Sequence, residues 1–85
     1  MSTISELRKQ IDVLDAQMLK VLEERVSIVQ KVRKIKEQEE IPYTDLTREE
    51  EIISNAQKGS SLSEESVETI LRHILQISKQ ESQKE

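Results

Sequence analysis

The first forty residues carry hydrophobic side chains at the three- and four-residue intervals of one face of an α-helix. No Gly or Pro occurs before Pro42, which cannot continue a helix and disfavours helical geometry at the residue before it. Thr3 and Glu6 have the spacing of a capping box, a signature of helix starts. The pattern therefore predicts one helix from about residue 3 to about residue 39. Its hydrophobic positions are Ile4, Leu7, Ile11, Leu14, Met18, Val21, Leu22, Ile28, Val29, Val32 and Ile35.

A corner is expected at Pro42 and Tyr43, where Tyr43 is interpreted as a packing residue rather than a ligand contact. A second capping-box spacing in Thr47–Glu50 then predicts a shorter helix. The only glycine, Gly59, stands where the C-terminal cap of this helix belongs. The hydrophobic residues assigned to the second helix are Leu46, Ile52, Ile53 and Ala56.

A third helix is predicted to open within Ser61–Glu64, which has the spacing of a further cap. Its lone histidine, His73, is assigned to the surface without a role. The polar tail from about residue 80 to residue 85 is expected to fray. The hydrophobic face of the third helix comprises Val67, Ile70, Leu71, Ile74, Leu75 and Ile77.

The predicted first helix is too long for one chain to cover. At about 1.5 Å per residue it extends for about 55 Å, whereas a compact chain of this size has a radius of gyration of about 12 Å. Two short helices leave part of the hydrophobic stripe in water, so we predict an intertwined homodimer in which two long helices run side by side. A long coiled coil is the alternative, but the imperfect heptads and the short helices favour a bundle. The prediction is an all-α fold with a single domain over residues 1–85.

Composition narrows the chemistry. Of the 85 residues, 35% are charged and 34% are hydrophobic, without Phe or Trp, which is typical of solvent-exposed helices with a modest core. Without cysteine there is no disulfide or thiolate chemistry, and a single histidine argues against a metal site, so no metal or cofactor is expected. The net charge of −4 argues against nucleic-acid binding. No signal sequence or membrane-spanning segment is recognisable, which predicts a cytoplasmic protein that does not bind membranes.

Cations interrupt the hydrophobic stripe of the first helix. Arg8, Arg25 and Lys36 fall at helical intervals from hydrophobic positions, on or beside the face that should be dry, and Ser78 and Ser82 do the same on the third helix. A single such cation usually extends its head to water. Because unpaired buried charge is costly, three of them favour a cationic pocket for a small ligand with more than one negative charge.

The corner adds Asp45, Arg48 and Glu49, close to the end of the first helix and to Lys36. Two interpretations are open at this point. Asp45 can be a helix cap followed by a solvated first turn, or the three residues can belong to the pocket.

These positions resemble the all-helical chorismate mutases. The family has a Leu-Arg pair on a long helix, a spaced Ile-Asp, Asp, Leu and Arg pattern, a Lys eleven residues further on, and a Pro-containing corner followed by Asp-x-x-Arg-Glu. The match runs without gaps from about residue 7 to residue 51 and resumes in the third helix. The matching residues are Leu7, Arg8, Ile11, Asp12, Asp15, Leu19, Leu22, Arg25, Lys36, Pro42, Asp45, Arg48 and Glu49.

The resemblance implies a homodimer with active sites shared between chains. It implies conversion of chorismate to prephenate, a concerted Claisen rearrangement of the shikimate pathway that leads to the aromatic amino acids Phe and Tyr. In such a site Arg8 reaches into the partner chain's pocket and Arg25 acts in its own, so that the two grip the substrate's carboxylates. Lys36 binds the ether oxygen of the breaking bond. Glu49 and the backbone around Asp45 hold the ring hydroxyl.

The resemblance also assigns Arg48 and Ser78 to a carboxylate and reveals one departure. The family commonly has Gln four residues after the serine of the third helix, where it shares the ether oxygen with the lysine. Here that position is Ser82, and Gln83 follows one residue later, about 100° further around a straight helix. Either a distortion brings Gln83 in, or Ser82 acts through a water molecule, or the contact is missing.

Three alternatives remain at the level of the sequence. The same scaffold serves isochorismate pyruvate lyases, whose substrate is a nearly identical dianion. A mutase-like regulatory domain of another shikimate-pathway enzyme is the second alternative. A purely structural dimerisation module is the third, and the interruptions at Arg25 and Lys36 argue against it.

Overall fold

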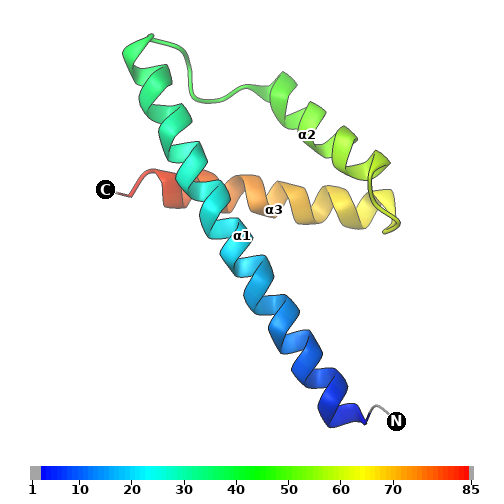
Figure 1. Ribbon diagram of the computed structural model, residues 1–85. Helices are drawn as coiled ribbons and strands as arrows, with labels where there is room; N and C mark the ends of the chain where they lie inside the picture. The colour runs from blue at the N-terminus through cyan, green and yellow to red at the C-terminus, as the bar shows by residue number, and fades with distance from the viewer. Residues whose placement is uncertain (1–2, 85) are drawn as a thin grey trace.

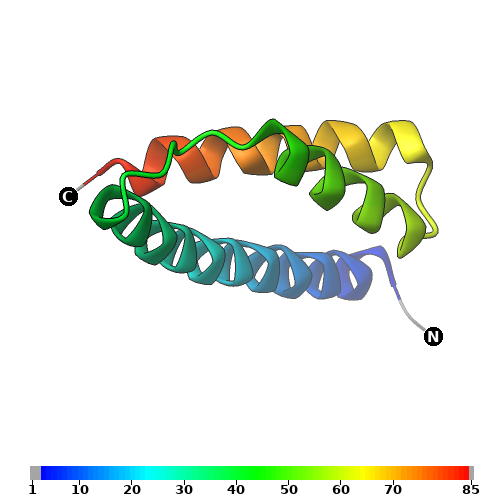
Figure 2. The ribbon, with the colours of Figure 1, turned by 90° about the horizontal axis from the view of Figure 1, so that it is seen from above.

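The computed structural model describes residues 3–84, which form three helices. They are α1 (Ile4–Gln38), α2 (Leu46–Lys58) and α3 (Glu64–Ser82). α3 packs against both of the others, crossing the C-terminal half of α1 with its own C-terminal half and running back beside α2 (Figure 1). Seen from above, α1 and the pair formed by α2 and α3 make two layers that meet at the corner (Figure 2). The described residues contain no strand, so the all-α prediction is confirmed.

The bounds of α1 agree with those predicted from the sequence. The helix ends, however, in a C-terminal capping motif that its sequence did not indicate. At its start, the backbone N–H of Thr3 donates to Glu6 Oε2 at 3.1 Å and that of Glu6 donates to Thr3 Oγ1 at 3.2 Å, which confirms the capping box. At its end, Glu40 has a φ of 58°. The N–H of Ile41 then donates to the carbonyl of Lys36 at 2.8 Å, and the N–H of Glu40 to that of Glu37 at 3.3 Å. These two bonds form a Schellman motif, which ends the helix before the chain reaches Pro42.

The N-cap of α2 differs from the capping box predicted at Thr47, whereas that of α3 lies within the predicted segment. α2 begins two residues early, because Asp45 Oδ1 accepts the N–H of Arg48 at 3.0 Å; Thr47 is therefore not the cap. Aspartate is the stronger of these two caps, which explains the choice. At α3 the cap is Ser63, whose Oγ accepts the N–H of Ser66 at 3.2 Å, so this helix opens within Ser61–Glu64 as predicted.

The C-terminal ends of α2 and α3 are both defined by a capping residue. Gly59 is the C-cap of α2, as predicted, with a φ of −93° that any residue can adopt. α3 continues to Ser82, with Gln83 as its C-cap, so helical structure extends into the polar tail that was expected to fray. Ser82, in this last turn, is 8% exposed.

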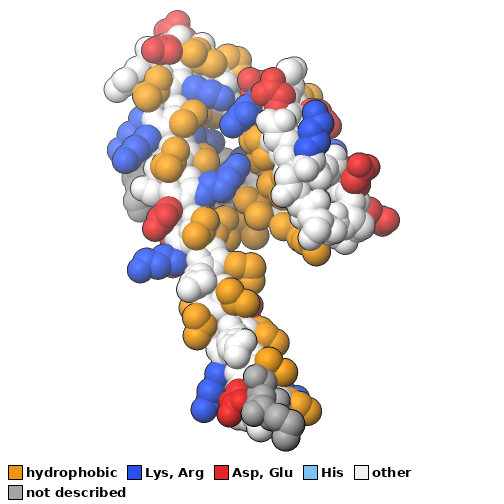
Figure 3. Space-filling model, turned by 45° about the vertical axis from the view of Figure 1, so that its right-hand side comes forward, with side chains coloured by type: hydrophobic (Ala, Val, Ile, Leu, Met, Phe, Trp, Pro, Cys, Tyr) orange, Lys and Arg blue, Asp and Glu red, His pale blue; other side chains and the backbone are white. Residues whose placement is uncertain are grey.

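The core is very small. Among the described residues only Ile53, Val67 and Leu75 are buried hydrophobics, and α1 contributes no buried residue at all. The hydrophobic stripe on the N-terminal half of α1 lies open along the lower arm of the molecule (Figure 3). The radius of gyration is 16.2 Å and the longest dimension is 58 Å, as expected for a helix that projects from its own chain.

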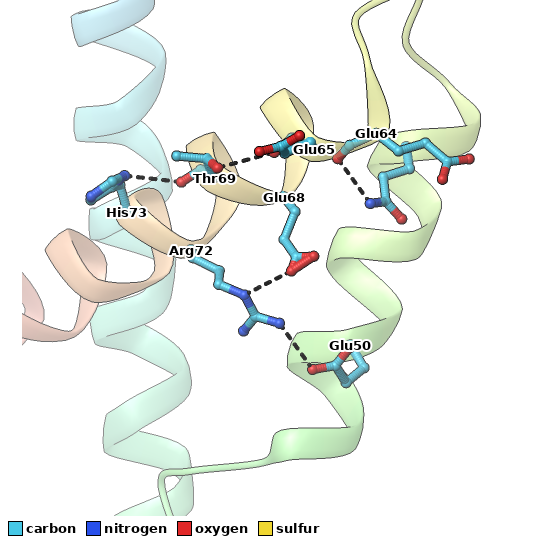
Figure 4. Close-up of polar contacts among 8 residues, drawn as sticks. Glu50, Glu64, Glu65, Glu68, Thr69, Arg72 and His73 are labelled. Atoms are coloured by element: carbon cyan, nitrogen blue, oxygen red, sulfur yellow. Dashed lines mark hydrogen bonds and ion pairs between the residues drawn. The ribbon is translucent and has the colours of Figure 1, made fainter.

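Polar contacts also join α2 to α3 (Figure 4). Arg72 of α3 lies between Glu68 at 3.2 Å and Glu50 of α2 at 3.4 Å. The hydrogen bond to Glu68 is the main cause of a raised pKa of Arg72. Gln57 Nε2 donates to the carbonyl of Glu64 at 3.0 Å. Polar side chains on the surface therefore connect the two short helices.

His73 is exposed, with its Nδ1 2.9 Å from the carbonyl of Thr69. No helix within residues 3–84 combines the length and the hydrophobicity that a membrane crossing requires.

Candidate active site

A cavity of about 460 Å³ opens between the C-terminal half of α1, the corner, the first turns of α2 and the last turns of α3. Figure 3 shows Lys and Arg side chains gathered where the upper part of α1 faces α2. Seven of the eight candidate site residues line this cavity: Arg25, Lys36, Asp45, Arg48, Glu49, Ser78 and Ser82. Residues that lie far apart in the sequence and on three helices therefore meet at one place.

Arg25 and Ser78 are direct partners. Arg25 Nη1 donates to Ser78 Oγ at 2.6 Å, and Ser78 is only 2% exposed. Arg25 is half-buried between the stripe of α1 and the hydrophobic face of α3. The serine thus holds the guanidinium at the cavity wall and leaves its other N–H groups for a ligand.

Lys36 is held at the opposite end of the cavity by the corner. Its Nζ donates to the backbone carbonyl of Tyr43 at 3.2 Å, which leaves two of the three ammonium donors. The hydroxyl of Tyr43 donates to Glu37, and the guanidinium of Arg33 lies 4.0 Å from the centre of the tyrosine ring. The hydrogen bond to Glu37 is the main cause of a raised pKa of Tyr43. Tyr43 therefore packs at the corner and also lines the cavity.

The three candidate residues at the start of α2 make different contacts. The side chain of Asp45 caps α2, which agrees with one of the two interpretations of the sequence. The same residue also borders the cavity. Arg48 pairs with Glu51 at 3.5 Å and keeps most of its side chain in solvent. Glu49 is the least exposed of the three, and its Oε1 lies 3.1 Å from Lys79 Nζ.

The last turn of α3 brings in two residues that sequence reasoning missed or left open. Lys79, to which the sequence assigned no role, lines the cavity. Gln83, the C-cap of α3, also lines it, although its backbone keeps a right-handed helical conformation with φ −82° and ψ −15°. The hydroxyl of Ser82 donates to the carbonyl of Lys79 at 3.1 Å, within its own helix.

Arg8 is not among the residues that line the cavity. It is exposed on the first turns of α1, seventeen residues before Arg25. At about 1.5 Å per residue this places it roughly 25 Å along the helix from Arg25. Within one chain the structure therefore does not bring Arg8 to the site.

The chemistry that this cavity can support is limited and specific. Its wall carries five cations, Arg25, Arg33, Lys36, Arg48 and Lys79, against two carboxylates. Within residues 3–84, no group of three or more His, Asp or Glu side chains is placed to hold a metal ion. Such a cavity in an all-helical chain is suited to a small, multiply charged anion. Its cations can orient that anion and stabilise its negative charge.

Comparison with known proteins assigns the family. Residues 7–83 match the sequence model for chorismate mutase type II, so the chain belongs to the chorismate mutase type II family. Among solved structures, the chain is similar to chorismate mutase (form I) from Thermus thermophilus. The two are 27% identical with a TM-score of 0.82, over 88% of this chain and 96% of that one. No curated protein matches the sequence. The resemblance seen in the sequence is thus confirmed.

Proposed function

We propose that the protein is a chorismate mutase, an isomerase that converts chorismate to prephenate in aromatic amino acid biosynthesis. Membership of the chorismate mutase type II family supports this function. The observation that carries the proposal at the level of the site is the convergence of Arg25, Lys36 and Glu49 on one cavity. Chorismate is a dianion with an ether oxygen and one ring hydroxyl, and each of these groups has a complementary side chain in the cavity.

The first contribution is orientation. The enolpyruvyl arm of chorismate must fold over the ring before the new C–C bond can form, and pinning both carboxylates achieves this. Arg25, fixed by its 2.6 Å bond to Ser78, binds one carboxylate. Arg48 supports the carboxylate end, and Arg8 of a second copy of the chain supplies the remaining contact.

The second contribution is electrostatic. The C–O bond breaks before the C–C bond is complete, so negative charge grows on the ether oxygen. The Lys36 ammonium, fixed by the Tyr43 carbonyl, stabilises that charge without reorganising. A single well-placed donor of this kind contributes about 3–4 kcal/mol to transition-state stabilisation.

Gln83 supplies a second donor to the same oxygen. It is the C-cap of α3 and lines the cavity, whereas the Ser82 hydroxyl is engaged by the Lys79 carbonyl. Of the three possibilities that the sequence leaves open, the geometry favours the side chain of Gln83.

The homodimer belongs to the same proposal. Four hydrophobic residues on the N-terminal half of α1, Ile11, Leu14, Met18 and Val21, are each more than half exposed. A second copy that covers this stripe would also carry its own Arg8 toward the cavity. Both the uncovered stripe and the absence of Arg8 from the cavity of its own chain support active sites shared between two chains.

The test is a direct assay on the purified chain. We expect the absorbance of chorismate to fall and prephenate to form, without metal or cofactor. Isochorismate is assayed in parallel, and release of pyruvate from it in place of chorismate rearrangement would identify a lyase. A chain that turns over chorismate only after addition of cell extract would be a regulatory domain that depends on a partner.

A further inference from the structure

Among the residues that the structure describes, one buried side-chain oxygen in the cavity wall has no hydrogen-bond partner. Within the described residues, Glu49 Oε2 is buried and makes no hydrogen bond, while Oε1 of the same carboxylate contacts Lys79 Nζ at 3.1 Å. An ionised carboxylate accepts hydrogen bonds and donates none, and leaving a buried acceptor unpaired costs free energy. Glu49 lines the cavity, so a donor on a bound ligand can remove that cost.

We propose that Lys79 is a positioning residue that orients Glu49 so that Oε2 accepts a hydrogen bond from the ring hydroxyl of the substrate. This inference rests on the proposed function. The chemistry of the ligand selects the hydroxyl, because chorismate at neutral pH has two ionised carboxylates, an ether oxygen and a single O–H donor. No other group of that dianion can donate a hydrogen bond to a carboxylate.

The position of Lys79 explains why it can act through Glu49. Glu49 lies in the first turn of α2 and Lys79 in the last turn of α3, so their contact joins two walls of the cavity. A glutamate side chain has several rotamers, and the neighbouring Arg48 is already paired with Glu51. Within residues 3–84, Lys79 is the one basic group in ion-pair contact with Glu49.

Stability is a poor explanation for this ion pair. The Lys79 side chain is 46% exposed, and pairs of that kind contribute little to folding. A second pair, between Arg72 and Glu50, already joins α2 to α3 (Figure 4). Arg72 thus provides a matched control, since it bridges the same two helices but does not line the cavity.

The experiment compares chorismate with its analogue in which hydrogen replaces the ring hydroxyl. We expect the wild type to favour chorismate by at least ~10-fold in kcat/KM, the scale of one hydrogen bond to a charged group. Lys79→Met should reduce that preference to within ~3-fold, mainly through a higher KM for chorismate, because the hydroxyl is remote from the breaking bond. Lys79→Arg should retain the preference, and Arg72→Met should leave it unchanged.

The preference is a ratio and does not depend on the fraction of active protein, so a partly unfolded variant is still informative. An equal loss on both substrates in Lys79→Met would overturn the inference, as would an unchanged preference or a wild type that does not distinguish the substrates. In a Glu49→Gln background, Lys79→Met should cause little further loss, since the group that it orients is already altered. A wild type inactive on chorismate would instead refute the proposed function.

Discussion

At the scale of the residue, the two cations that interrupt the hydrophobic stripe of α1 at the cavity are each held by a named partner. Arg25 contacts a nearly fully buried serine, and Lys36 contacts a backbone carbonyl of the corner. Both contacts are to neutral oxygen atoms, so neither neutralises the positive charge. The cavity therefore keeps its charge while its cations are fixed in place, which is the requirement for electrostatic preorganisation.

Lys36→Ala tests the electrostatic contribution. We expect kcat to fall by at least ~100-fold, because the lost ammonium stabilises charge that develops only in the transition state. Helix content and oligomeric state should not change. Lys31→Ala is the matched control: Lys31 is an exposed lysine on the same helix that does not line the cavity. A near-normal rate in Lys36→Ala would remove the electrostatic account.

Gln83→Ala and Ser82→Ala separate the two candidates for the second donor. We expect Gln83→Ala to lower kcat by about 10-fold, the value of one hydrogen bond that strengthens in the transition state. Ser82→Ala should lower it by less than about 3-fold, because its hydroxyl donates to the Lys79 carbonyl within α3. Steady-state kinetics with chorismate provides the measurement, and the reverse order would assign the donor to Ser82.

At the scale of the element, the end of α1 determines where the corner and Tyr43 lie. Glu40 adopts a left-handed conformation that glycine adopts without cost and a side chain does not. The Schellman bonds from Ile41 and Glu40 compensate for that cost. The carbonyl of Tyr43 is thereby held where Lys36 can reach it.

Glu40→Gly should stabilise the protein. We expect a gain of about 1 kcal/mol in the free energy of unfolding, because the substitution relieves strain at the positive φ. Glu39→Gly is the control and should destabilise, since Glu39 has an ordinary φ of −94° and glycine there only adds freedom to the unfolded chain. Urea unfolding at a fixed protein concentration measures both. A loss in Glu40→Gly comparable to that in Glu39→Gly would contradict the role of the Schellman motif.

The sequence predicted the helices and the two α1 cations that line the cavity because both depend on local periodicity. A cation that falls in a hydrophobic stripe is visible in one dimension, and Arg25 and Lys36 were found in this way. Lys79 was not found, because its significance depends on a contact with Glu49 thirty residues away on another helix. The start of α2 was left open for a different reason, since Asp45 and Thr47 are both capping residues and lie two positions apart.

At the scale of the whole molecule, one chain has only a small core, and its cavity does not contain Arg8. α1 buries no side chain, and Leu14, Met18 and Val21 are 57–63% exposed. Removing the rest of these side chains from water is favourable, which supports a second copy that covers the stripe. The same end of α1 carries Arg8, which the cavity of its own chain does not contain. Association and catalysis are therefore expected to depend on the same helix.

Mixing two inactive variants tests this dependence. In the proposed dimer, Arg8→Ala chains lack the arginine that would enter the partner's site. Lys36→Ala chains lack the lysine of their own site. In a hybrid dimer, the site built on the Arg8→Ala chain keeps its own Lys36 and receives an intact Arg8, whereas the other site lacks both.

After unfolding and refolding of an equal mixture, half of the dimers are hybrids with one intact site in two, so we expect about a quarter of wild-type activity. Each variant refolded alone is the control and should stay inactive. If Arg8 acted within its own chain, every site in the mixture would lack one essential cation and no activity would return. Recovery thus depends on the reach of α1 into a second copy, which is the arrangement that its length and its exposed stripe favour.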